Sequence, residues 1–215
     1  MRVFGHKNAI TAVRESIEGA AELGVKYLTL YAFSTENWSR PEDEVTALME
    51  LLVDTISGEV PNMMKNSIRL LSIGDIESLP KKAREKLHEA ITMTAANTGL
   101  TVVLALSYSG RWEIQHAIKS IVKKVVDHQL QIEDITQEAI AAHLNTKNIP
   151  DPELLIRTSG EIRISNFLLW QLAYTELYFT EVLWPDFRKE HLVEAILDYQ
   201  KRERRFGKTG AQIKP

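Results

Sequence analysis

Hydrophobic positions along this chain alternate between two spacings. In residues 8–23 they recur every third or fourth residue, at Ile10, Val13 and Ile17, which is the spacing of one helix face. In residues 27–33 they run almost without interruption, as in a strand that is covered on both faces. Both patterns repeat along the chain. They predict helices at 8–23, 42–64, 80–97, 112–126, 136–144 and 188–206, and strands at 27–33, 67–73, 101–106, 154–156 and 177–179.

This order of elements predicts the fold class. Strands that are separated by helices of such length require right-handed crossover connections and a mainly parallel sheet. The chain has 215 residues and shows neither an internal repeat nor a linker, which fits a single domain. We therefore predict an α/β fold with a single domain and a mainly parallel central sheet flanked by helices.

Composition narrows the classes of function that this chain could have. A formal net charge of -3 argues against general binding of nucleic acid. The chain contains no cysteine, so disulfide bonds and thiolate catalysis are excluded. Every uninterrupted apolar run is shorter than the roughly 20 residues that span a bilayer, and no signal peptide is visible. We expect a cytoplasmic protein.

The stretch 157–167 is the strongest candidate for chemistry. It places Arg157, Arg163 and Ser165 close together, directly after the apolar run 154–156. Sites in open α/β sheets usually lie at such strand ends. The planar fork of arginine donates several hydrogen bonds at once, which suits phosphate. The sequence therefore predicts a phosphate-binding loop here.

Two other predicted strands run into loops of similar character, 34–40 and 107–112, which carry hydroxyl groups and arginine. In a parallel sheet, the carboxyl ends of all strands lie at one edge. A single loop of this kind could serve only to cap a helix, because Ser, Thr and Asn favour caps and turns. Three such loops at one edge favour a phosphate or diphosphate pocket.

Longer motifs run through the whole chain in order. They are FGHK at 4–7, LTLYAFSTENW at 28–38, SGR at 109–111, LIRTSGE at 155–161, RISNFLLWQ at 163–171, ELYF at 176–179 and WPDF at 184–187. In these motifs the chain resembles the cis-prenyltransferases, and among them the bacterial undecaprenyl diphosphate synthases. The resemblance implies a homodimer that condenses isopentenyl diphosphate units onto farnesyl diphosphate with Mg²⁺. The implied product is undecaprenyl diphosphate, used as a lipid carrier in cell-wall (peptidoglycan) synthesis.

The resemblance also implies which residues bind the substrates. The corresponding positions are Arg2, His6, Ser34, Thr35, Glu36, Trp38, Arg40, Arg157, Arg163, Ile164 and Ser165. Arg157, Arg163 and Ser165 would grip isopentenyl diphosphate through charge-assisted hydrogen bonds. Arg2 and His6 would lie near the allylic diphosphate, where they can neutralise the leaving group as its C–O bond breaks.

Two further positions carry implied roles in catalysis and metal binding. Asn37 corresponds to the proposed proton acceptor, and because an amide is a poor base we expect it to position groups for proton loss. Glu176 corresponds to a carboxylate that binds Mg²⁺, a hard cation that prefers oxygen ligands. Residues 162–177 resemble the family's dimer contact, so Glu176 could serve the site of a partner subunit.

Several of these residues also allow a plainer interpretation. His6 could cap a helix or lie on the surface, Trp38 could anchor the core, and Glu176 could be an ordinary interface carboxylate. The basic run 201–205 is best interpreted as a solvated helix face. Its alternative is contact with anionic lipid headgroups at the inner face of the membrane.

The resemblance implies a hydrophobic tunnel for the growing chain, formed by the helix 42–64 and the strands 27–33 and 67–73. Methionines near this helix suit an adaptable apolar channel, although periodicity alone identifies only core residues. If Ala32 lines the tunnel, enlarging it to leucine should shorten the product.

The chain departs from the family pattern in two places. The family begins with a strand followed by Asp-Gly-Asn-Gly-Arg-Trp, which carries the catalytic aspartate and a Mg²⁺ contact, and no such segment occurs in this sequence. We therefore expect residues 1–215 to be an N-terminally clipped cis-prenyltransferase domain that lacks a central strand of its sheet. Ile162 stands where many members have a histidine near the metal, and isoleucine cannot bind Mg²⁺.

Two other functions stay open from the sequence. One is a non-catalytic partner subunit of a cis-prenyltransferase complex, and the other is a generic phosphate-binding α/β protein. The loop 34–40 and the intact pair Arg157 and Arg163 favour the enzyme, because a subunit without catalysis has no need of both.

Overall fold

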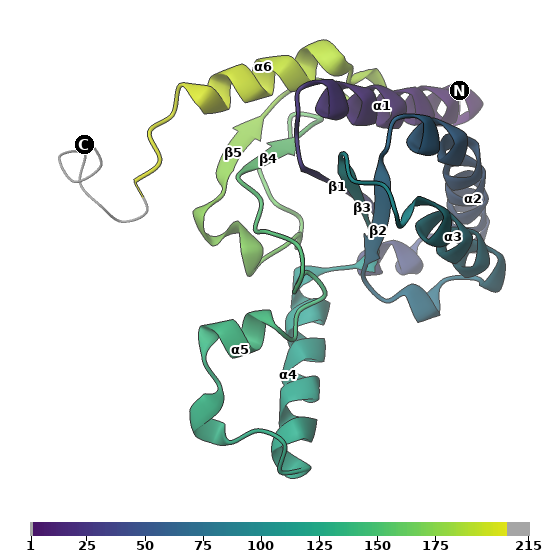
Figure 1. Ribbon diagram of the computed structural model, residues 1–215. Helices are drawn as coiled ribbons and strands as arrows, with labels where there is room; N and C mark the ends of the chain where they lie inside the picture. The colour runs from purple at the N-terminus through teal and green to yellow at the C-terminus, as the bar shows by residue number, and fades with distance from the viewer. Residues whose placement is uncertain (1, 206–215) are drawn as a thin grey trace.

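Parallel strands organise the structure, a computed structural model that describes residues 2–205, with side chains from Asn8 onward (Figure 1). The helices are α1 (Arg2–Glu22), α2 (Glu42–Lys65), α3 (Lys81–Thr94), α4 (Gly110–Val126), α5 (Gln137–Ala141) and α6 (Lys189–Gln200). The strands are β1 (Tyr27–Ser34), β2 (Arg69–Ile73), β3 (Thr101–Tyr108), β4 (Leu154–Arg157) and β5 (Glu176–Phe179). Short 3-10 turns are η1 (Thr35–Ser39), η2 (Ile76–Ser78), η3 (Ile132–Asp134), η4 (Gln171–Tyr174) and η5 (Trp184–Asp186).

The strands pair in two groups. The first has the order β1-β3-β2 and the second pairs β4 with β5, and every pairing is parallel. Every residue of the central strand β3 is buried, which explains its continuous apolar sequence. The predicted α/β class with parallel strands and flanking helices is confirmed.

Helices cover these strands from several directions. Figure 1 shows α2 and α3 beside the three-stranded sheet, and α1 together with α6 across one end of the molecule. The main core joins these layers, with Ile17 of α1, Leu70 of β2 and Leu106 of β3 almost fully buried. The helices α4 and α5 extend away from both sheets (Figure 1).

Three predicted helices are shorter than their patterns suggested. The helix predicted at 80–97 is α3, which ends at Thr94. The helix predicted at 136–144 is α5, which begins where Thr136 Oγ1 accepts a hydrogen bond from the Ala139 amide and ends at Ala141. The helix predicted at 188–206 ends at Gln200. The interpretation of the basic run 201–205 as a solvated helix face is therefore wrong. Beyond Gln200 the run leaves the helical path, and Arg202 and Arg204 pair with the distant carboxylates of Glu176 and Glu153.

The two groups of strands leave a space between them. Among the described residues, β1 pairs only with β3, and β4 pairs only with β5. A cavity of about 820 Å³ lies between β1 and β4 and continues along α2. The free edges of β1 and β4 therefore both border one apolar space.

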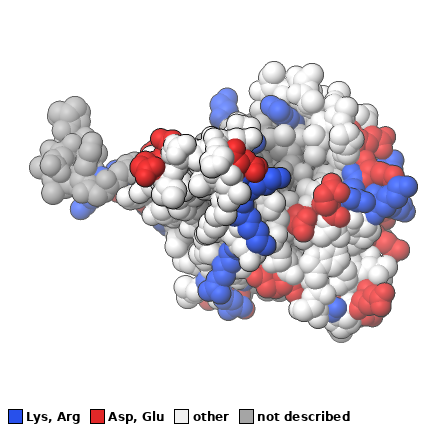
Figure 2. All heavy atoms as spheres, turned by 90° about the horizontal axis from the view of Figure 1, so that it is seen from below, with Lys and Arg blue, Asp and Glu red and all other residues white. Residues whose placement is uncertain are grey.

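The described surface is chemically mixed. On the face shown in Figure 2, acidic and basic side chains are interspersed around broad uncharged areas. None of the described helices has the length and apolar character that crossing a bilayer requires.

Candidate active site

Three loops converge at the carboxyl ends of the strands, as the sequence predicted. The loop after β1 meets the loop after β3, where Thr35 Oγ1 donates to Ser109 Oγ over 2.8 Å. The loop after β4 reaches both of them through Asn166, whose side-chain amide donates to Glu36 Oε1 over 2.7 Å. The Arg111 amide in turn donates to Asn166 Oδ1 over 3.0 Å. Parallel pairing thus brings together residues that lie far apart in the sequence.

A polar cavity of about 510 Å³ opens between these loops. Its lining residues are Ser34, Glu36, Arg111, Arg163, Ser165, Asn166 and Leu169. Arg163 is exposed and forms an ion pair with Glu161. Two guanidinium groups and two serine hydroxyls around one cavity form a donor set that suits a phosphate or diphosphate group.

Irregular backbone shapes the strand ends beside this cavity. The register of β1 against β3 shifts between Tyr31 and Ser34, and Ser107 of β3 adopts a left-handed φ of 47°. Bulges of this kind redirect side chains at the end of a sheet. The Ser107 hydroxyl accepts a hydrogen bond from Trp38 Nε1 over 2.9 Å, which fixes the loop after β1 against β3.

Asn37 stabilises its own loop. Its Oδ1 accepts a hydrogen bond from the Ser34 amide over 2.9 Å, which closes the turn η1 at the strand end. The amide oxygen is therefore engaged with backbone, and an amide is a poor base in any case. This contact favours a role in holding Ser34 at the mouth of the polar cavity.

Glu36 is the acidic member of the polar cavity. Burial alone would raise the pKa of Glu36, but hydrogen bonds from Asn166 and from its own loop outweigh burial and lower that pKa. Glu36 is therefore ionised at neutral pH. A carboxylate beside arginines can orient them, and it also places one negative charge where a diphosphate would approach.

The larger cavity is mainly apolar and begins next to the polar one. Its lining includes Tyr31, Ala32 and Phe33 of β1 and Ile164 of the third loop. Burial and then the nearby Glu36 carboxylate raise the pKa of Tyr31 to about 12, so its hydroxyl stays protonated. That hydroxyl donates to the carbonyl oxygen of Tyr108 over 3.0 Å.

Arg157 lies at the border of the larger cavity. It ends β4 and lines the cavity together with Thr158 and Ser159. Its Nε atom is buried and has no hydrogen-bond partner among the described residues. Because a buried donor without a partner is costly, this atom is suited to meeting a ligand oxygen. Arg157 and Arg163 therefore line neighbouring cavities rather than the same one.

Comparison with known proteins places this site in a family. The family model described as "Putative undecaprenyl diphosphate synthase" matches residues 1–207. The chain belongs to this prenyltransferase family. An isoprenyl transferase of Porphyromonas gingivalis is 55% identical over 212 residues, which cover 99% of this chain and 84% of that protein.

Other relatives agree. A ditrans,polycis-undecaprenyl-diphosphate synthase of Vibrio vulnificus, named as specific for (2E,6E)-farnesyl diphosphate, is 50% identical over 213 residues, covering 99% of this chain and 85% of that one. The crystal structure of lavandulyl diphosphate synthase from Lavandula x intermedia, in complex with dimethylallyl diphosphate, superimposes with a TM-score of 0.91 and 37% identity. It covers 94% of this chain and 88% of that chain.

Two residues expected at the prenyltransferase site lie beside it. The Trp38 ring packs edge-on against Phe33 at 4.9 Å between centroids, and it is partly buried against the core. Neither cavity described here has Trp38 in its lining, so this conformation favours the core-anchor interpretation. Arg40 is exposed and pairs with Glu44 over 2.8 Å, at the entrance to α2. Arg2 and His6 have side chains outside the described residues.

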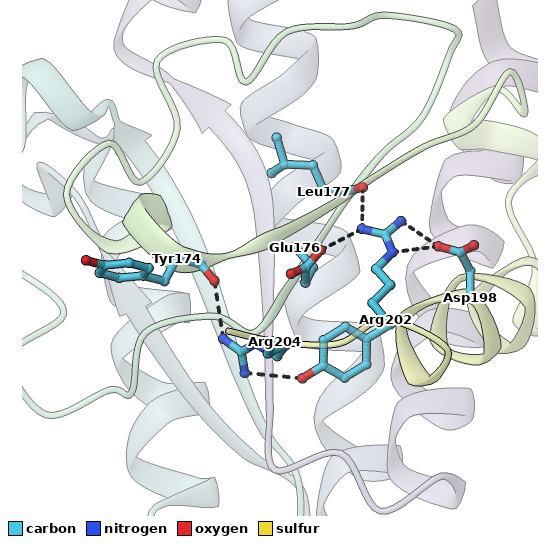
Figure 3. A network of polar contacts seen from close by, with 7 residues as sticks. Tyr174, Glu176, Leu177, Asp198, Arg202 and Arg204 are labelled. Carbon is cyan, nitrogen blue, oxygen red and sulfur yellow. Dashed lines mark hydrogen bonds and ion pairs between the residues drawn. The ribbon is translucent and has the colours of Figure 1, made fainter. Parts of the chain in front are cut away.

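Glu176 lies away from the polar cavity within one chain. It begins β5 and pairs in register with Leu154, whereas Arg157 at the other end of β4 pairs with Phe179. Leu154 and Arg157 are three residues apart along β4, which corresponds to about 10 Å. Figure 3 shows Arg202 extended toward the Glu176 carboxylate, at 3.0 Å, and toward Asp198. In this conformation, the Glu176 carboxylate, which was expected to bind metal, forms an ion pair with Arg202.

The segment that carries Arg202 is tied down at a second point. Arg204 donates to Glu153 Oε1 over 2.9 Å. It also donates to the Tyr174 carbonyl oxygen (Figure 3). These contacts engage the basic run with this chain's own carboxylates. Because these arginines are paired, less of the positive charge of the basic run is available for the alternative interpretation, contact with anionic lipid headgroups.

Sequence reasoning missed two residues that organise the site. Asn166 was visible within the RISNFLLWQ motif, but nothing in its spacing showed that it contacts Glu36 or Arg111. Glu113 was not singled out from the sequence, yet it is buried and accepts hydrogen bonds from Tyr108 Oη at 2.6 Å and Gln171 Nε2 at 2.9 Å. Only the amphipathic pattern of α4, which places Glu113 on the inner face, could have indicated it.

Proposed function

We propose that this protein is a cis-prenyltransferase that condenses isopentenyl diphosphate units onto farnesyl diphosphate to give undecaprenyl diphosphate. The observation that carries the proposal is that consecutive residues of the same two segments line two unlike cavities. Ser34 lines the polar cavity while the preceding Phe33 lines the apolar one, and Ser165 and Ile164 divide in the same way. A substrate with a charged diphosphate and a long hydrocarbon tail requires this combination.

The residues present support the chemistry step by step. Arg163 and Ser165 would bind the diphosphate of isopentenyl diphosphate, with Arg157 approaching from the border of the apolar cavity. The allylic C–O bond breaks, a C–C bond forms to isopentenyl diphosphate, and a proton and diphosphate leave. The Asn37 turn would orient Ser34 near the site of proton loss. The hydrocarbon product would then extend along Ala32 and α2.

The free edges of β1 and β4 support the expected additional strand. Each presents unpaired backbone groups toward the apolar cavity, and burial of such groups without partners is costly. One parallel strand between them would join both groups into a continuous sheet. We infer that the family's aspartate-bearing segment occupies this position, since its following loop would then lie at the same carboxyl edge as Ser34 and Arg157.

Mg²⁺ is the proposed cofactor, and its ligands would come from more than one source. Among the described residues no three carboxylate or imidazole groups converge on a metal site, so these residues do not by themselves provide a fitting donor set. Mg²⁺ often takes only one or two carboxylates and binds substrate phosphates for the rest. Glu176 would contribute from a second copy, and the bound ion would neutralise diphosphate charge.

Exposed apolar side chains support the proposed homodimer. Ile162 is 80% exposed and Tyr174 is 68% exposed, within the stretch 162–177 that resembles the family's dimer contact. On α4, Val122 and Val126 are also exposed and share one helix face. Covering these side chains with a second copy would bury apolar area and bring Glu176 toward another active site. A cytoplasmic location, at the inner face of the membrane, stays a prediction.

One assay tests the proposed function. The 215-residue chain, and the same chain preceded by the family's aspartate-bearing segment, are incubated with farnesyl diphosphate, radiolabelled isopentenyl diphosphate and Mg²⁺, then extracted with butanol. We expect the extended chain to transfer label into the organic phase and the 215-residue chain to transfer little. Binding without turnover by both would support a non-catalytic partner subunit. Absence of both binding and turnover would contradict the prenyltransferase proposal and leave a generic phosphate-binding protein.

A further inference from the structure

Asn166 joins all three loops of the polar cavity. Its Oδ1 accepts a hydrogen bond from the Arg111 amide over 3.0 Å, and its backbone oxygen accepts one from the Gly110 amide over 2.6 Å. Its Nδ2 donates to Glu36 Oε1 over 2.7 Å. These bonds connect the loop after β4 to the start of α4 and to the loop after β1. One side chain therefore fixes the relative position of segments that are distant in sequence.

The local backbone depends on these bonds. Ser165 and Asn166 both adopt left-handed conformations, with φ of 49° and 60°. L-residues seldom take this conformation in succession, although asparagine tolerates it better than most. Ser109, which precedes α4, makes no capping bond to that helix through its side chain, so Asn166 supplies the cap from another loop. The shape that turns Arg163 and Ser165 toward the cavity is thus held by contacts of Asn166.

The helix start and the loop also fit tightly. A Cβ atom at Gly110 would lie 2.6 Å from Leu169 Cγ and 2.9 Å from the Leu169 amide nitrogen. No side chain fits at this position without movement of the loop. Close contact at Gly110 and hydrogen bonds at Asn166 together lock Arg111 beside Ser165.

We propose that Asn166 is a positioning residue that sets Arg111, Arg163 and Ser165 to bind one diphosphate group. This inference rests on the proposed function, because the diphosphate is the ligand that those residues would share. Asn166 acts through the neighbours that it orients, and its Nδ2 is already committed to Glu36. Loss of its side chain should therefore weaken diphosphate binding while leaving the guanidinium groups and hydroxyls in the protein.

The first test compares Asn166→Ala with Asn97→Ala. Asn97 is a matched control because its side chain also bridges elements, donating to the Ile68 carbonyl oxygen over 2.7 Å, but lies outside both cavity linings. Isothermal titration with isopentenyl diphosphate should give binding at least tenfold weaker for Asn166→Ala and unchanged for Asn97→Ala, with melting temperatures lowered in both. Equal affinities in the two variants would overturn the proposal.

A second variant separates positioning from folding. In Asn166→Asp one oxygen can still accept from Arg111, but the other faces the Glu36 carboxylate and repels it. Adding Glu36→Gln supplies an amide that can donate to the new aspartate. We expect the double variant to bind isopentenyl diphosphate more tightly than Asn166→Asp alone. No recovery in the double variant would contradict the assigned contact between residues 36 and 166.

Hydrogen exchange distinguishes failure of this inference from failure of the proposed function. The Arg111 amide donates to Asn166 Oδ1, so its exchange should quicken in Asn166→Ala with no ligand present. If wild-type protein does not bind isopentenyl diphosphate, the proposed function falls, and with it the assigned ligand. If wild type binds but Arg111 exchange and affinity are unchanged in Asn166→Ala, only the role of Asn166 is overturned.

Discussion

The polar and apolar cavities are built from the same chain segments but have opposite chemistry. Ser34 and Ser165 line the polar cavity, whereas their immediate neighbours Phe33 and Ile164 line the apolar one. In β1, successive side chains point to opposite faces, so Phe33 and Ser34 can serve both spaces. Ser165 has a left-handed φ of 49°, so the division between Ile164 and Ser165 belongs to a turn of the third loop. The difference shows that two consecutive residues can serve an amphipathic ligand, one facing its charged head and the next facing its apolar tail.

Aromatic residues form one wall of the apolar cavity. Tyr31 stacks on Phe167 with 4.4 Å between ring centroids, and the Tyr108 ring meets Phe167 edge-on at 5.9 Å. Behind this wall, Tyr108 Oη reaches the buried Glu113 carboxylate. The wall is therefore apolar toward the cavity and is anchored by hydrogen bonds on its far side.

The largest expected effect comes from removing charge in the polar cavity. Arg163→Ala should weaken binding of isopentenyl diphosphate about 100-fold, or about 2.7 kcal/mol, because charge-assisted hydrogen bonds are lost. Titration calorimetry would measure this, with Arg84→Ala as the control, since Arg84 pairs with Glu77 at a surface position. An Arg163→Ala affinity within threefold of wild type would show that the polar cavity is not the diphosphate site.

Removing the anchor of the wall should lower stability. Tyr108→Phe leaves Glu113 without its 2.6 Å donor in a buried position, and we expect a loss of about 1–3 kcal/mol in the free energy of unfolding. Urea titration would measure it. The control is Tyr199→Phe, whose hydroxyl donates to exposed Glu153 over 3.3 Å and should cost less than about 0.5 kcal/mol. Equal losses in both variants would contradict the anchoring role of Glu113.

Filling the apolar cavity should change the product rather than the binding of the diphosphate. Ala32→Leu adds a branched side chain to the lining of β1, so the hydrocarbon would meet an obstacle and the product should become shorter. Chromatography of the butanol-soluble products from the active protein would show this. Ala96→Leu, at an exposed position outside both linings, is the control. Full-length product from Ala32→Leu would remove Ala32 from the proposed tunnel.

The smallest effect concerns the charge of Glu36. Because the pKa of Glu36 is lowered in the folded protein, its ionised form contributes stability above the pKa of the unfolded chain, and this contribution is lost as pH falls through the lower folded value. Wild type should therefore exceed Glu36→Gln in melting temperature at neutral pH. The gap should close as the pH is lowered below about 4. A gap that is constant with pH would mean that the hydrogen bonds to Glu36 do not favour its charged form.

The sequence alone predicted much of the frame. Apolar runs predicted β1 and β3, and a helical stripe predicted α2. The strand β3 is buried throughout, whereas β1, which was expected to be covered on both faces, exposes Tyr27 and Ala32. The basic run at 201–205 misled this reasoning, since its helical spacing continued past the true end of α6. Arg202 pairs with Asp198 of α6 and also with Glu176, a residue of another element that no local pattern reveals.

The candidate site, too, was predicted in part from the sequence and decided in part by the tertiary structure. Hydroxyl groups and arginines after three predicted strands were enough to expect a phosphate pocket at one sheet edge, because parallel topology places all those ends together. Their assignment to two separate cavities, the unpaired Nε of Arg157 and the bonds of Asn166 were decided only by tertiary structure. Sequence periodicity determines which face of an element is buried. It does not determine which distant side chain fills the neighbouring space, because that contact depends on how whole elements pack.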